Sequence, residues 1–68
     1  MRLTVNGDAM ELSPAANLAE LLRLLDVDPG GPGIAVASNG RVVPRSELSA
    51  CPVREGDRIE VVRAVQGG

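Results

Sequence analysis

The chain has 68 residues, a formal net charge of -2 and 7 basic residues, all of them Arg, and it contains no His, Trp, Tyr or Phe. A chain of this length forms one domain with a thin core and has no room for an enclosed active-site cleft. The missing residue types exclude proton transfer or metal ligation by His, Schiff-base chemistry on Lys and base stacking on aromatic rings, and the negative charge disfavours phosphate backbones.

The first segment predicts a β-hairpin. Residues 2–5 alternate polar and apolar side chains, which is the period of a half-buried strand. The Asn-Gly-Asp sequence at 6–8 consists of residues that tolerate the positive φ of a tight hairpin turn. Residues 9–12 then form a second, antiparallel strand, in which we expect Met10 and Leu12 to enter the core.

Residues 17–25 predict one amphipathic helix of about two and a half turns. Asn17 can cap its first turn, and Glu20 stands at the position of a capping-box carboxylate. Four leucines at helical spacing share one face, which we expect to pack on a sheet: Leu18, Leu21, Leu22 and Leu25. The segment 28–33 is rich in Gly and Pro and ends the helix. Because it follows a helix and lacks Lys, we interpret it as a loop and not as a phosphate-binding motif.

The second half of the chain predicts three further strands. Residues 34–38 are apolar on both faces, which indicates a strand with neighbours on both sides. An Asn-Gly turn at 39–40 leads into a short strand at 41–43, and residues 58–63 form the last strand. Between the last two strands, residues 45–53 form a loop with one short helical turn, and residues 55–57 form a tight turn.

The order strand, strand, helix, strand, strand, strand predicts an α+β roll. We expect a mixed sheet of about five strands packed on one α-helix, with the first and last strands parallel at its centre. This is the pattern of the β-grasp fold. We assign residues 1–64 to the β-grasp domain and residues 65–68 to a flexible C-terminal tail that ends in Gly-Gly.

The Gly-Gly end is the one motif that predicts chemistry. Two residues without Cβ atoms make a slim end that can enter a narrow channel in a partner and present its carboxylate there. A free carboxylate is a poor electrophile and must first be activated, for instance as a mixed anhydride with AMP. A sulfur nucleophile can then displace AMP and leave a thiocarboxylate.

The chain resembles a known family in segments that follow one another over nearly its whole length. The more specific ones are a Val-Pro-Arg-Ser-Glu run at 43–47 and the Ala-Val-Gln-Gly-Gly end at 64–68, and the others lie at 3–7, 18–22, 35–36, 39–40 and 56–62. These are similar to the ThiS family, the sulfur carriers of thiamine biosynthesis among the ubiquitin-like β-grasp proteins. The family often has Trp where this chain has Leu48, and its loop at 28–33 is less rich in Gly and Pro.

The resemblance implies a carrier and not an enzyme, so no catalytic residue is assigned. It implies that an ATP-dependent, ThiF-type adenylyltransferase forms a glycyl adenylate at Gly68, and that sulfur from cysteine, released by a desulfurase, converts it to a thiocarboxylate (1-thioglycine). Thiazole synthase would then take this sulfur into the thiazole ring. Val65, Gln66 and Gly67 would thread into the partners. The carrier would bind no cofactor, and ATP would be consumed by the activating enzyme.

One face of the sheet predicts a docking surface for these partners. If the core residues face the helix, the residues that point away from it leave a smooth, weakly polar surface beside the tail: Thr4, Ala35, Ala37 and Val62. Arg58 and Arg63 would add charge complementarity at its rim.

Other hypotheses stay open at this point. The chain could be a sulfur carrier for molybdopterin synthesis, held as the small subunit of a synthase. It could be a protein modifier joined to lysines through Gly68. It could also be a plain binding module, whose function would not need Gly67 and Gly68.

Cys51 is the only cysteine, so the chain can form no internal disulfide, and we interpret it as a small packing residue in a protein of a reducing compartment. No run of 18 apolar residues and no signal-peptide core is present. We expect a soluble cytoplasmic protein that is monomeric when free. We expect it to bind no metal, no nucleic acid and no membrane.

Overall fold

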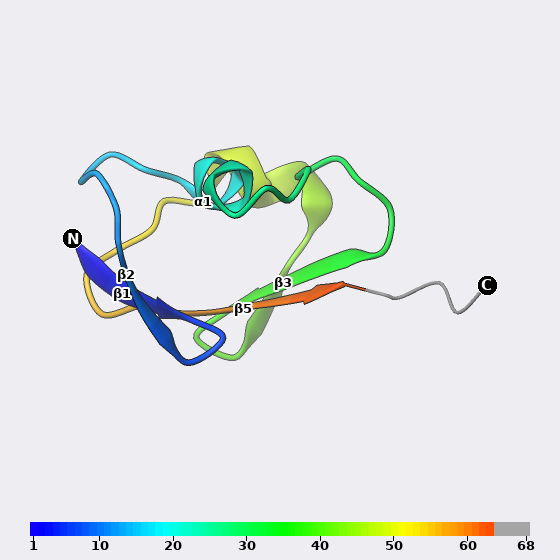
Figure 1. Cartoon of the computed structure of the whole chain (residues 1–68). Helices are drawn as coiled ribbons and strands as arrows, with labels where there is room; N and C mark the ends of the chain where they lie inside the picture. Colours follow the sequence, from blue (N-terminus) through cyan, green and yellow to red (C-terminus); the bar gives the residue numbers. More distant parts are fainter. Residues whose placement is uncertain (64–68) are drawn as a thin grey trace.

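The computed structural model describes residues 1–63, in which α1 lies across one face of a five-stranded sheet (Figure 1). The elements in chain order are β1 (Arg2–Val5), β2 (Asp8–Glu11), α1 (Leu18–Leu24), β3 (Ile34–Ser38), β4 (Arg41–Val43), the 3-10 helix η1 (Arg45–Ala50) and β5 (Arg58–Arg63). The predicted α+β roll with one helix and five strands is therefore confirmed.

The last strand forms the middle of the sheet, whose order is β2-β1-β5-β3-β4. β5 pairs in parallel with β1, where Val5 lies opposite Ile59, and antiparallel with β3, where Ile34 lies opposite Arg63. The parallel pairing of the first and last strands agrees with the prediction. The predicted tail residues, Val65, Gln66, Gly67 and Gly68, lie outside the described residues, and so does Ala64 at the predicted domain boundary.

Two hairpin turns with the same sequence flank the central strand. Asn6 has a φ of 50° and Gly7 of 87°, and Asn39 has a φ of 51° and Gly40 of 84°. Both central residues of each turn therefore lie in the left-handed region, which Asn and Gly tolerate better than other residues. The two Asn-Gly turns predicted from the sequence are confirmed.

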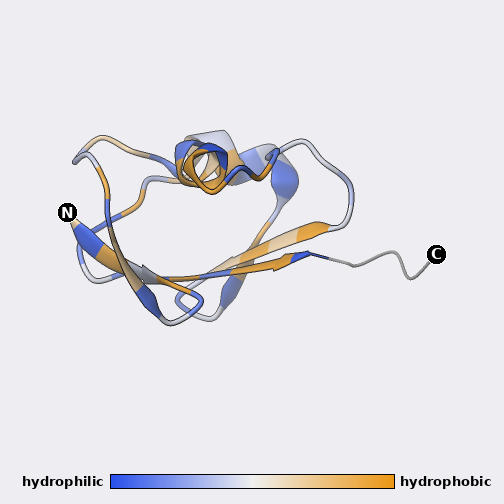
Figure 2. Cartoon of the chain, viewed as in Figure 1, coloured by the Kyte–Doolittle hydropathy of each residue, from blue (hydrophilic) through white to orange (hydrophobic). Residues whose placement is uncertain are grey.

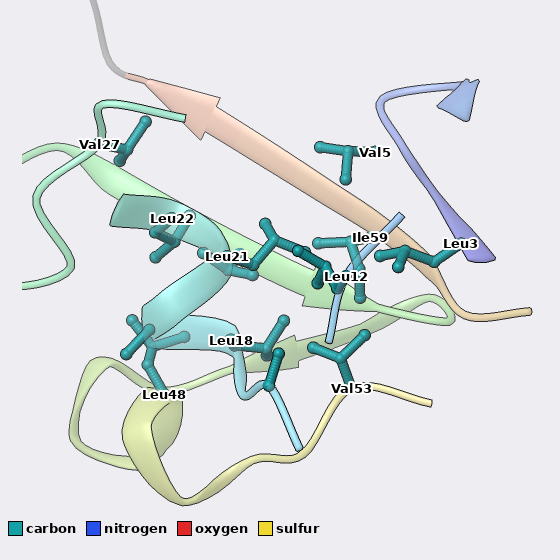
Figure 3. Packing of buried hydrophobic residues seen from close by; sticks show 13 residues of the cluster. Leu3, Val5, Leu12, Leu18, Leu21, Leu22, Val27, Leu48, Val53 and Ile59 are labelled. Atoms are coloured by element: carbon teal, nitrogen blue, oxygen red, sulfur yellow. The ribbon is translucent and has the colours of Figure 1, made fainter. Parts of the chain in front are cut away.

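The core lies between α1 and the inner face of the sheet, as the buried side chains in Figure 3 show. Leu18, Leu21 and Leu22 of α1 are fully buried and face strand residues such as Ile59. Leu48 of η1 is also buried, so an aliphatic side chain fills the position at which the resembling family often has Trp. Hydrophobic colour covers much of β3 and the C-terminal half of β5 in Figure 2.

The helix begins as predicted, because the Asn17 side chain accepts a hydrogen bond from the Glu20 amide at 2.9 Å. Its end also agrees with the predicted span of 17–25, because the helix stops at Leu24 with Leu25 as the half-buried C-cap. The residues that stop it differ from the prediction, since they lie before the segment 28–33.

The physical reason is a Schellman motif. Asp26 takes a positive φ of 58°, and the Val27 amide donates back to the Leu22 carbonyl at 2.8 Å. Val27 is then buried against the core. In the part of the chain that the structure describes, no helix is long and apolar enough to cross a membrane.

We predict that Leu22→Ala lowers the free energy of unfolding by about 2–5 kcal/mol, because it removes a fully buried side chain and leaves a cavity. Urea denaturation followed by circular dichroism measures this loss. Leu24→Ala is the matched control, since Leu24 lies in the same helix with 66% of its surface exposed, and we expect a change within about 0.5 kcal/mol. Similar losses in the two variants would contradict the assigned helix face.

Candidate functional site

The described part of the site is the open face of the sheet, opposite α1. Strand residues alternate between two faces, and Val36 and Ile59 are buried on the helix side. Their neighbours point outward, with Ala35 opposite Val62 and Ala37 opposite Val42. We call these four outward residues the sheet patch: Ala35, Ala37, Val42 and Val62.

The sheet patch brings together three of the predicted docking residues and one that the sequence analysis missed. Val62 is 60% exposed and Val42 is 70% exposed, so two branched apolar side chains face solvent on one surface. A signal for Val42 was present in the sequence. A two-residue Asn-Gly turn at 39–40 sets the hairpin register, which places Val42 opposite Ala37.

The two arginines expected at the rim of this face, Arg58 and Arg63, lie on opposite faces of the sheet. Arg58 is exposed and pairs with Thr4 near the start of β5, where it shares the outward face with Glu60 and Val62. Arg63 differs from the prediction. The two-residue period of the strand places it on the helix side with Val61, because an odd step along β5 reverses the face.

A groove of about 670 Å³ lies on that helix side, beside the last described residues of β5. Its apolar lining comes from three separate parts of the chain, and its polar lining includes the Arg63 side chain. The full set of lining residues is Val5, Asn6, Asp8, Ala9, Met10, Leu25, Val27, Val61 and Arg63. No local sequence pattern predicts this groove, because the first hairpin, the helix end and β5 meet only in the folded chain.

Clustering and burial are the features that would mark side chains able to bind a metal or act as nucleophiles among the described residues. Within residues 1–63, no group of three or more His, Cys, Asp or Glu side chains gathers as a metal site, and no polar or charged side chain is buried. Cys51 is half-buried and packs against the core, with its Sγ atom 3.9 Å from the Pro52 carbonyl oxygen.

Comparison with known proteins gives consistent results. A family model described as the ThiS family matches residues 3–68. The sulfur carrier protein ThiS of Escherichia coli (strain K12) is 31% identical over 68 residues, which cover 100% of both chains. A thiazole synthase of Paramagnetospirillum magneticum is 34% identical over 100% of this chain, which spans 20% of that longer protein.

Solved structures agree with the sequence comparisons. The crystal structure of the thiamine biosynthesis protein ThiS from Geobacter metallireducens has a TM-score of 0.81 at 34% identity and covers 100% of both chains. A solution structure of a thiamine biosynthesis protein from the same organism has a TM-score of 0.78 at 33% identity, covering 100% of this chain and 88% of that one.

Proposed function

The chain belongs to the ThiS family of sulfur carriers in thiamine biosynthesis, and on this premise we propose that its Gly68 carboxylate carries the sulfur as a thiocarboxylate. The observation that carries the proposal is the reach of the family match, which extends through residue 68 and so includes both terminal glycines. A carrier of this kind is a co-substrate of its partners and does not catalyse the reactions itself.

The proposed chemistry has two steps. A carboxylate oxygen of Gly68 attacks the α-phosphorus of ATP, and pyrophosphate leaves, which gives a glycyl adenylate. Hydrosulfide, the simplest sulfur donor, then attacks the carbonyl carbon; a C–S bond forms and AMP departs with the electron pair of the C–O bond. Loss of the remaining proton leaves a thiocarboxylate, which is a good sulfur nucleophile. ATP is consumed by the activating enzyme, and the carrier holds no cofactor.

The proposed partners are a ThiF-type adenylyltransferase, which activates Gly68, and thiazole synthase, which takes the sulfur. A cysteine desulfurase supplies sulfur to the first of these indirectly. The thiazole synthase of Paramagnetospirillum magneticum supports the second partner, because one fifth of its length is similar to this whole chain. Because a segment similar to this chain is part of a thiazole synthase in that organism, we propose the same two units as partners on separate chains here.

We assign the docking role to the sheet patch. Val62 lies one residue before the end of β5, so a partner that covers this apolar surface also holds the strand from which the tail starts. Burial of exposed valines supplies a non-directional attraction, while Arg58 and Glu60 on the same face orient the encounter through their charges.

We predict that the full chain gains the mass difference between one sulfur and one oxygen atom when it is incubated with ATP, a ThiF-type adenylyltransferase and sulfide. Intact mass spectrometry measures this change. Deletion of Gly68, or one Ala added after it, should abolish the gain because the reactive carboxylate is then displaced. Urea denaturation should show that both variants keep the wild-type stability.

A mass gain in the extended variant would contradict the role of Gly68. Isopeptide conjugates on lysines of other proteins would instead indicate a modifier. A stable complex with the large subunit of molybdopterin synthase would indicate the alternative sulfur pathway.

We further predict that the double variant Val42→Thr, Val62→Thr weakens binding to each partner by roughly tenfold, because Thr keeps the strand shape and removes apolar surface. Isothermal titration calorimetry measures the dissociation constant. Leu24→Gln is the control, since Leu24 is equally exposed on the helix side of the domain. Unchanged affinity in the double variant, or an equal loss in the control, would show that docking uses another surface.

A further inference from the structure

The end of β5 is supported unequally on its two sides. Up to Ile59 the strand has β1 on one side and β3 on the other, but β1 ends at Val5, opposite Ile59. Beyond that point β3 continues to pair as far as Arg63, while the first hairpin turns away at Asn6. The β1 side of residues 61–63 therefore has no strand beside it.

One side chain takes the place of the missing strand. The Val61 amide donates to Asn6 Oδ1 at 2.9 Å, and Asn6 Nδ2 donates to the Val61 carbonyl at 3.2 Å. The Asn6 backbone amide also donates to the Ile59 carbonyl at 2.9 Å. The carboxamide thus supplies both the acceptor and the donor that a further residue of β1 would offer.

This arrangement depends on the turn in which Asn6 lies. Its φ of 50° turns the main chain away from the sheet while its side chain stays beside β5. Asn is one of the few residues that tolerate this conformation and also carry a donor and an acceptor on one short side chain. The sequence pattern predicts only that Asn6 lies in a turn, and the turn alone does not require its two side-chain hydrogen bonds to Val61.

We propose that Asn6 is a positioning residue for the Gly68 carboxylate, because it fixes the β1 side of the strand from which the tail starts. The inference rests on the proposed function. We call the two hydrogen bonds between the Asn6 side chain and Val61 the clamp. With the clamp, β5 is held on both sides as far as Val61; without it, the last residue held on both sides is Ile59. Without these hydrogen bonds the position of the end of β5 varies more, and this is the point from which the chain runs on to Gly68. A smaller fraction of encounters with the partner then brings the Gly68 carboxylate into its site.

The chain contains a matched control at the other end of the same strand. Asn39 precedes Gly40 in the second hairpin, has a φ of 51°, and accepts a hydrogen bond from the Arg58 amide at 2.9 Å through its Oδ1 atom. Its backbone amide donates to the Arg58 carbonyl at 2.8 Å. Asn39 therefore holds the start of β5 through its Oδ1 atom, while its Nδ2 atom donates to Asp57 Oδ1 at 3.0 Å and not to a strand carbonyl.

The experiment compares wild type, Asn6→Gly and Asn39→Gly in charging by the adenylyltransferase with ATP and sulfide. Gly removes each carboxamide without strain at positive φ. We expect Asn6→Gly to lower kcat about three- to tenfold and to leave KM within about twofold, because the sheet patch still docks. Asn39→Gly should leave both constants within about twofold. Asn6→Asp keeps an acceptor for the Val61 amide and should lie between wild type and Asn6→Gly.

Amide hydrogen exchange provides a readout that does not depend on activity. The Val61 amide should exchange faster in Asn6→Gly, and the Arg58 amide should exchange faster in Asn39→Gly, because each amide loses its side-chain acceptor. Urea denaturation measures the loss of stability in each variant. Equal kcat values in the two glycine variants, or wild-type charging by Asn6→Gly, would overturn the positioning role alone. Failure of the wild-type chain to gain sulfur would overturn the proposed function and this inference with it. If Asn6→Gly does not fold, the kcat of Asn6→Asp decides the question.

Discussion

The structure depends on the insertion of β5 between β1 and β3. The first hairpin and the second hairpin have no direct strand pairing, so β5 alone joins them into one sheet. The parallel pairing with β1 connects Thr4 to Arg58 and Val5 to Ile59, which are far apart in the sequence. This long-range contact also brings the leucine face of α1 over a continuous sheet, and the core forms between them.

The same strand carries both parts of the proposed function. Its outward residues include Val62 of the sheet patch, and its last described residue, Arg63, precedes the tail that contains Gly68. The surface that a partner would hold and the chain end that it would modify are therefore fixed to one rigid element.

Local patterns predicted most of the fold, and long-range geometry explains what they did not predict. Alternation and the Asn-Gly turns identified all five strands, and leucine spacing identified the helix. The residue that stops the helix was missed, because Asp26 occupies a left-handed position where Gly is the usual signal. Arg63 was assigned to the wrong face, although the two-residue period of the strand places it on the same face as Ile59 and Val61. The clamp from Asn6 to Val61 joins distant residues, and no local pattern reports it.

The central place of β5 has a consequence for damaged copies of the protein. A proteolytic cut within β5 would remove the strand that joins the two hairpins and would uncover the core between the sheet and α1. Loss of the chain end together with part of this strand would therefore also destabilise the whole domain.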